Sequence, residues 1–415
     1  MVFLKSNSVY SSLSLIGVIL LLYIYLFNPV FVFPGFGLNN IMLLVAGVYC
    51  LLNKEVFLRE LSMYRVELFF ALLAVLYFMI MSFISDSVYI NGVSSLFGLF
   101  STLLFLPIFL VNVVFKRFND IGFFNLLIVV GLMAACISVF SLIFPAFNSF
   151  IRGIQTDIEM EGVDKLGLES LRSFGLGGNL TSAYGYIMGI FASICLLIMV
   201  ETRQWIYGLY ILFFLAAAMI NARTGILVFV IALLYVFANS IRRFSIKNIA
   251  FIGLIVLLAV SAFLYLQTVN SEMFDYLYSF VEFFITLNDF EDSAYSRMLI
   301  FPDTLQGFIW GEGLDVFGGD AGEGSDIGYV RNIFFGGLFF LLLIVAEQFV
   351  LFKNMYIRSG RAPFVLMMAL SVMIFHYKGC LCYGVNAVSR FLMLYYFLLS
   401  YNITHSEEEE IVELR

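Results

Sequence analysis

Apolar residues occur along this 415-residue chain in long runs that short polar segments separate. About 20 consecutive apolar residues suffice for an α-helix to cross the hydrocarbon core of a bilayer. The runs therefore predict an all-α polytopic integral membrane protein, folded as one membrane domain over residues 1–415. Twelve membrane-spanning helices are expected, at residues 11–30, 37–53, 66–84, 95–114, 121–146, 180–200, 204–220, 223–239, 248–267, 328–352, 362–377 and 383–401.

Composition supports the membrane prediction. Hydrophobic residues make up 62% of the chain and charged residues only 12%. A water-soluble domain of that composition could not cover its surface with polar groups. The net charge of -7 arises mostly in two long loops and an acidic tail, residues 402–415. Since no soluble basic patch exists, nucleic acid is excluded as a partner.

Two segments between the runs are much longer than the rest, residues 147–179 and 268–327. Loops of this length in compact proteins usually serve a function. In the second loop, residues 295–301 predict a short helix that ends before Pro302, and a glycine-rich stretch follows. By contrast, only residues 221–223 separate the seventh predicted helix from the eighth.

The basic residues predict the orientation, because cytoplasmic loops of membrane proteins are enriched in Lys and Arg. With both termini in the cytoplasm, 14 of the 22 basic residues fall on the cytoplasmic side. Residues 28–37 and 85–91, the loops after helices one and three, contain none. This alternation supports an even number of spans and places both long loops on the far side of the membrane.

The other eight basic residues lie on the far side or inside a helix, against the usual charge bias. They are Arg152, Lys165, Arg172, Arg223, Arg297, Arg331, Lys378 and Arg390. A full charge near the bilayer centre costs roughly 2.5–3.5 kcal/mol even on lenient scales. Arginine carries a planar fork of donors that suits phosphate oxygens. We therefore expect most of this set to surround a phosphate-rich substrate.

Ordinary structural explanations compete with this one for each charge. Arg223 can snorkel to the interface, and Arg331 can pair locally with Asp326. Arg390, about a third of the way into the last predicted helix, can belong to a buried structural pair. Loop charges and salt bridges are the alternatives for the residues in the long loops, Arg172 and Arg297; Arg152 and Lys165 stand among acids and are expected to be solvated.

Acid–base chemistry has few candidates on the far side. His376 is one of two histidines, and Asp326 and Glu323 stand where the second long loop re-enters the membrane. A general base must reach the hydroxyl that it deprotonates. The acids show no spacing that resembles an established metal site, so neither a metal nor another cofactor is predicted.

Short motifs in a fixed order then suggest a family. They are Arg172-Ser173-Phe174-Gly175, Asn221-Ala222-Arg223-Thr224-Gly225-Ile226, Ser296-Arg297, Gly311-Glu312-Gly313-Leu314, Gly324-Ser325-Asp326-Ile327-Gly328-Tyr329, Gly336-Gly337, His376-Tyr377-Lys378-Gly379 and Ser389-Arg390. In this order, among twelve predicted helices and two long loops, they resemble the O-antigen polymerases of the Wzy type. These belong to the superfamily of O-antigen ligases and polymerases.

The resemblance implies a metal-independent membrane glycosyltransferase of the bacterial inner membrane, with a helical architecture similar to the GT-C class and two periplasmic loops. The donor and acceptor would be glycans linked to undecaprenyl pyrophosphate, and the growing chain would be transferred en bloc. Membrane lipid and a chain-length regulator protein are the other candidate partners.

The resemblance also gives the candidate residues their roles. Without a metal, cationic side chains must offset the charge of the leaving pyrophosphate. Catalytic roles fall to Arg223 and Arg297, with Asp326 or His376 positioning or deprotonating the acceptor hydroxyl. The residues expected to bind pyrophosphate or glycan are Arg172, Arg331, Lys378 and Arg390.

Two other functions remain open. Related ligases, which attach glycan to lipid A core, usually carry a histidine near the end of the second loop, and this chain has none there. A lipid-linked oligosaccharide flippase would carry charges along a path through both leaflets, whereas the surplus cations here gather on one side.

Overall fold

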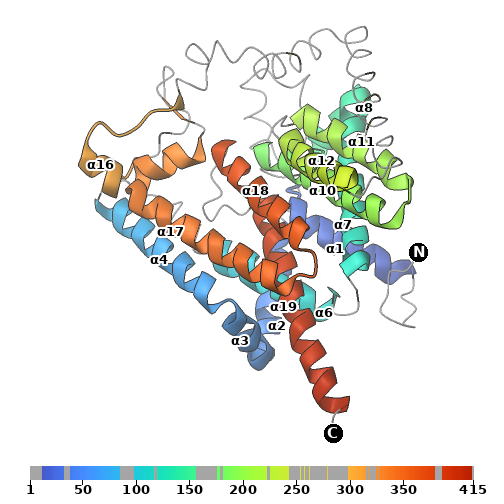
Figure 1. Ribbon diagram of the computed structural model, residues 1–415, viewed down its shortest axis with the longest axis horizontal. Helices are drawn as coiled ribbons and strands as arrows, with labels where there is room; N and C mark the ends of the chain where they lie inside the picture. Colours follow the sequence, from blue (N-terminus) through green and yellow to red (C-terminus); the bar gives the residue numbers. More distant parts are fainter. Residues whose placement is uncertain are drawn as a thin grey trace.

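The computed structural model of the chain is an assembly of α-helices (Figure 1). It describes residues 12–31, 38–84, 98–115, 118, 120–155, 175–177, 181–221, 225–242, 253, 257, 261, 278, 298–314, 316, 324–325, 327–378 and 386–413; at several helix ends it describes the backbone alone. Over these residues the chain forms no strand, and Phe31 and Gln155 make an isolated antiparallel bridge.

The helices follow one another with short connections. They are α1 (Ser12–Phe27), α2 (Asn39–Leu52), α3 (Lys54–Met63), α4 (Arg65–Ile84), the π-helix η1 (Leu99–Phe105), α6 (Leu106–Val113), α7 (Asp120–Ile143), α8 (Pro145–Ile154), α10 (Thr181–Thr202), α11 (Ile206–Asn221), α12 (Gly225–Arg242), α16 (Leu305–Trp310), α17 (Gly328–Arg358), α18 (Ala362–Lys378) and α19 (Ala387–Glu413). Figure 1 shows α4 beside α17 on one flank and α10, α11 and α12 grouped on the other.

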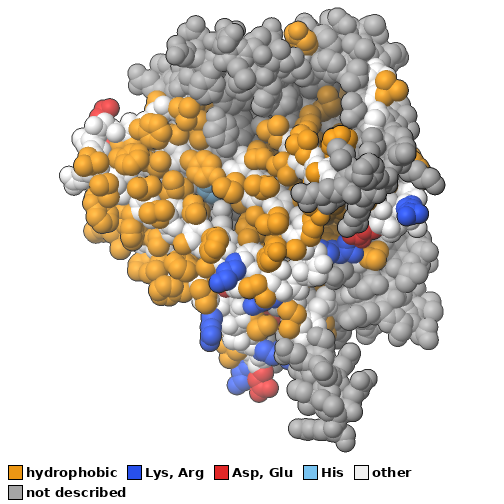
Figure 2. Space-filling model, in the orientation of Figure 1, with side chains coloured by type: hydrophobic (Ala, Val, Ile, Leu, Met, Phe, Trp, Pro, Cys, Tyr) orange, Lys and Arg blue, Asp and Glu red, His pale blue; other side chains and the backbone are white. Residues whose placement is uncertain are grey.

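The chain is a membrane-embedded helical protein. Four helices, α4, α7, α10 and α17, are long and apolar enough to cross a membrane, and the bent pair α2–α3 makes a fifth if it counts as one span. Five other apolar helices have 10–17 residues. Figure 2 shows a broad apolar face over α4 and α17, where Phe83 is 87% exposed and Phe349 68%. An apolar surface of this extent is expected to face lipid.

Eleven of the twelve predicted runs coincide with described helices. The ninth, residues 248–267, lies outside the described residues except for three isolated helical positions. The weak boundary after the seventh run is confirmed as a helix boundary, since α11 ends at Asn221 and α12 begins at Gly225. The number of spans itself stays a prediction, because only four or five helices meet the length criterion.

Three helices differ from the predicted runs in a way that local chemistry explains. The fifth run, 121–146, is broken: α7 ends at Ile143, and Phe144 is extended (φ -114°, ψ 100°) because the next residue is Pro145, which starts α8. The basic segment after α2 is helical, and α3 is bent 100° from α2. The tenth run continues to Arg358 as α17, with a break at Gly337.

The long loops fall only partly within the described residues. The first, 147–179, begins inside α8, and the second, 268–327, contains the short helix α16, which Thr304 caps by accepting a hydrogen bond from Gly307 N. Of the helix predicted at 295–301, Met298 is helical and residues 299–301 are not. The acidic tail, 402–415, continues α19 as a helix to Glu413.

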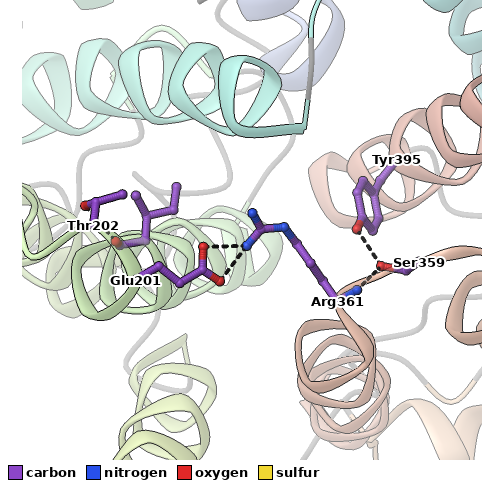
Figure 3. A network of polar contacts seen from close by, with 6 residues as sticks. Glu201, Thr202, Ser359, Arg361 and Tyr395 are labelled. Atoms are coloured by element: carbon purple, nitrogen blue, oxygen red, sulfur yellow. Dashed lines mark hydrogen bonds and ion pairs between the residues drawn. The ribbon is translucent and has the colours of Figure 1, made fainter. Parts of the chain in front are cut away.

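Polar contacts gather three of the predicted cytoplasmic segments at one end of the molecule. Asn354 donates to Glu67 Oε1 at 2.7 Å and Arg358 to the Met63 carbonyl at 3.1 Å, joining the end of α17 to the start of α4. Arg361 Nη1 binds both carboxylate oxygens of Glu201, at 2.7 and 2.8 Å, and so joins the start of α18 to the end of α10 (Figure 3).

We call this region the basic end, because it carries Lys54, Arg59, Arg65, Arg203, Lys353, Arg358 and Arg361. In Figure 2 charged side chains gather over α3 and the adjoining end of α17, below the apolar face. Helices α4, α10, α17, α18 and α19 each run from this end to the opposite one, which we call the far end. Described basic residues of three separate loops therefore share one end, as the positive-inside bias predicts.

Candidate functional site

At the far end, α17 and α18 meet in a polar cluster inside the bundle. Asn332 and His376 are both buried, and Asn332 Nδ2 lies 3.2 Å from His376 Nε2. One turn earlier, Tyr329 stacks beside the histidine with ring centroids 5.1 Å apart and donates its hydroxyl to the Met373 carbonyl at 3.0 Å. Buried polar groups must find partners, and these contacts fix the position of His376.

The contact with Asn332 also decides what His376 can do chemically. With the Asn332 amide as the donor, His376 Nε2 accepts, and the proton of the neutral ring resides on Nδ1. In this arrangement neither ring nitrogen is available to take a proton from a sugar hydroxyl. A general-base role would require the Asn332 amide to turn away from Nε2. The geometry therefore favours His376 as a group that ties α18 to α17.

Arg390 is enclosed where α19 begins beside the end of α1. Only 3% exposed, it donates from Nη1 to the carbonyls of Tyr25 and Leu26, each at 3.1 Å. The Tyr25 hydroxyl in turn donates to the Arg390 carbonyl at 3.1 Å. The last carbonyls of a helix lack intrahelical partners and attract a cation. These contacts correspond to the buried structural role rather than to an open phosphate site.

Ser138 of α7 receives two segments that adjoin candidate arginines in the sequence. Asn221, the last residue of α11, donates from Nδ2 to Ser138 Oγ at 3.1 Å. Gly175, in the left-handed region at φ +57°, lies so close that a Cβ would stand 3.2 Å from Ser138 N. The first segment precedes Arg223 by two residues, and the second follows Arg172 by three. Two motifs far apart in sequence thus converge on one position of α7.

Glycines on both helices bring the start of α12 against α10. Gly185 and Gly189 stand four residues apart and so share one face of α10. A Cβ on Gly189 or Gly225 would overlap the backbone of the facing helix, in one case at Gly225 O and in the other at Gly185 O. Small residues permit such close helix approach in membranes. The chain between α11 and α12 is consequently anchored at both ends, by Asn221 and by Gly225.

Four of the eight predicted site residues lie outside the described residues: Arg172, Arg223, Arg297 and Asp326. Arg331 stands in the first turn of α17 and is partly exposed, and Lys378 ends α18, where only the backbone is described. The structure thus brings Arg331, His376 and Lys378 to one pair of helices at the far end. Arg390 belongs to a helix end of its own, against α1.

The predicted site omitted acids that the helices bury at the basic end. Glu67 of α4 is fully buried; its Oε1 accepts from Asn354 at 2.7 Å and from the Tyr396 hydroxyl at 2.8 Å, while Oε2 has no hydrogen-bond partner. Glu347 of α17 accepts from a tyrosine hydroxyl at 3.3 Å. Both acids fall inside predicted spans. A search of the apolar runs for charges of either sign would have found them.

Comparison with known proteins adds no assignment. A scan against protein-family models and a search of curated proteins found no match for this chain. The fold defines the class, a membrane-embedded helical protein, and any function rests on the chain's own residues.

Proposed function

We propose that this protein is a membrane glycosyltransferase that polymerises oligosaccharide repeat units linked to undecaprenyl pyrophosphate, as the O-antigen polymerases do. One observation carries the proposal: candidate cations stand at helix ends of the far end, opposite the basic end. Among the described residues these are Arg331, Lys378 and Arg390. Positive charge at that end opposes the usual bias and is expected where an anionic substrate binds.

In the proposed reaction, an acceptor hydroxyl attacks the anomeric carbon of the donor glycan. The new glycosidic bond forms as the bond to pyrophosphate oxygen breaks, and undecaprenyl pyrophosphate leaves. Its developing charge requires preorganised cations in a site of low dielectric constant. We assign this role to Arg223, Arg297, Arg331 and Arg172. The convergence of Gly175 and Asn221 on Ser138 supports a shared site for the segments that carry Arg172 and Arg223.

The acceptor proton needs a base. Between the two candidates, the geometry of His376 favours Asp326, because Asn332 occupies the nitrogen that would accept the proton. Asp326 itself lies outside the described residues, and the residues on both sides of it are tied together by a 3.1 Å hydrogen bond from Ile327 N to Ser325 Oγ. We therefore propose Asp326 as the general base and His376 as its neighbour in the helix interface.

The proposal includes a topology: twelve spans, both termini in the cytoplasm, two periplasmic loops and a GT-C-like architecture in the inner membrane. The gathering of Lys54, Arg203 and Arg358 at the basic end supports a cytoplasmic assignment for that end. The lipid-linked donor and acceptor would then reach the far end from the periplasmic leaflet.

Deleting the gene in the bacterium that carries it tests this function. Loss of a polymerase leaves single repeat units on the surface lipid, and this is the result that we expect. Unattached lipid-linked polymer would instead indicate a ligase. Repeat units trapped on the cytoplasmic leaflet would indicate a flippase.

A further inference from the structure

We propose that two glycine motifs about 25 residues apart form a backbone clasp that positions the first half of α17, with Arg331 and Asn332, for the transfer reaction. The clasp consists of Gly311-Glu312-Gly313, after α16, and Gly336-Gly337, inside α17. The inference rests on the proposed function for its catalytic part and on geometry alone for its structural part.

The clasp is held by hydrogen bonds between main chains. Glu312 N donates to the Phe334 carbonyl at 2.8 Å, and Gly313 N donates to the Phe335 carbonyl at 2.9 Å. In an unbroken helix these carbonyls would accept from residues four positions on. The break at Gly337 (φ 68°, ψ -174°) removes those donors, and the loop supplies replacements. Each motif thereby satisfies backbone groups that the other leaves unpaired.

Both glycines are required by geometry. Gly311 (φ 84°) and Gly337 (φ 68°) adopt backbone conformations that side chains disfavour. A Cβ on Gly311 would overlap the Phe335 carbonyl oxygen, and one on Gly337 would overlap the Ile309 carbonyl oxygen. The two backbones therefore meet face to face with no space for a methyl group on either. The Tyr77 hydroxyl of α4 adds a hydrogen bond to the Trp310 carbonyl at 2.7 Å.

The break gives the two halves of α17 different partners. Before it, Tyr329 and Asn332 contact the end of α18 through Met373 O and His376. After it, the helix packs along α4 and ends at the basic end, where Asn354 binds Glu67. The clasp stands at the junction and sets the direction of the first half. Arg331 precedes Asn332 in that half, so its position relative to α18 depends on the clasp.

The test compares Gly337→Ala with Gly47→Ala, a matched control in α2 where a Cβ would meet nothing within 4 Å. Structure is read by a short bifunctional thiol crosslinker between Asn332→Cys and His376→Cys, in protein without its native cysteines. We expect Gly337→Ala to lose the crosslink and Gly47→Ala to keep it. A crosslink at the unmodified rate in folded Gly337→Ala overturns the clasp.

Activity is read in protein with residues 332 and 376 intact, as extension of a synthetic lipid-linked repeat unit. We expect Gly337→Ala to reduce turnover on the order of tenfold to a hundredfold, since misplacing a reacting group by about 1 Å has such effects; Gly47→Ala should match the unmodified protein. Loss of the crosslink with full turnover overturns the positioning role.

If Gly337→Ala does not accumulate, Tyr77→Phe decides, because it removes only the hydroxyl that holds Trp310. A weaker crosslink supports the clasp, and an unchanged one overturns it. Failure of the unmodified protein to extend the substrate would sink the proposed function while leaving the crosslinking result to judge the clasp by itself.

Discussion

Replacing Arg390 with Met separates a structural arginine from a substrate-binding one. The change keeps an unbranched side chain but removes the guanidinium that serves the carbonyls of Tyr25 and Leu26. Each buried carbonyl left without a partner costs about 1–3 kcal/mol, so the two together cost about 2–6 kcal/mol. Relief of the arginine's own burial offsets part of this cost. We expect a clear net loss of stability.

The assay is thermal unfolding of the purified protein in one detergent, followed by the fraction that remains monodisperse after heating. Arg65→Met is the control, because Arg65 is exposed at the start of α4. We expect Arg390→Met to melt several degrees lower and the control to melt with the unmodified protein. Equal melting of Arg390→Met, together with loss of substrate binding, would refute the structural reading of this residue.

Four further changes have defined outcomes. Asn221→Leu should lower stability by about 1–3 kcal/mol, because it removes the donor to Ser138 from a buried helix end, and it should reduce glycan extension by more than its loss of folded protein. His376→Gln, which retains a hydrogen-bonding group beside Asn332, should keep at least a substantial part of the extension activity; complete loss in folded protein would restore His376 as the base. Tyr396→Phe should destabilise by about 1–3 kcal/mol in the same melting assay, because Glu67 loses one of its two donors. Glu201→Gln should shift stability by less than about 1 kcal/mol, since the Glu201 side chain is 48% exposed and such ion pairs are screened.

The positions of the helices could be predicted well because apolar runs report them directly. What the runs could not report is where a helix breaks. Pro145 is a local signal that explains the end of α7. The break at Gly337 is different, because two adjacent glycines permit a break without requiring one. The deciding partner is the Gly311 loop, about 25 residues earlier in the chain, and pattern alone does not show that contact.

The site could be predicted only as a set of charges, without their partners. An arginine inside an apolar run must face an anion or a set of carbonyl dipoles, and both satisfy the same physical need. For Arg390 the structure selects the carbonyls of α1, 364 and 365 positions away in the chain. For Arg223 and Arg297 the question stays a prediction, because both lie outside the described residues. Buried Glu67 was within reach of the same reasoning, had acids been considered with cations.

The central claim is best tested by giving purified protein, in a lipid bilayer, a synthetic repeat unit on undecaprenyl pyrophosphate, with Arg223→Ala protein alongside. The account predicts products that grow by whole repeat units with the unmodified protein, and none with folded Arg223→Ala. No growth from an intact substrate would contradict the proposed polymerase activity. Growth of normal length with Arg223→Ala would contradict the role of arginine in holding the pyrophosphate.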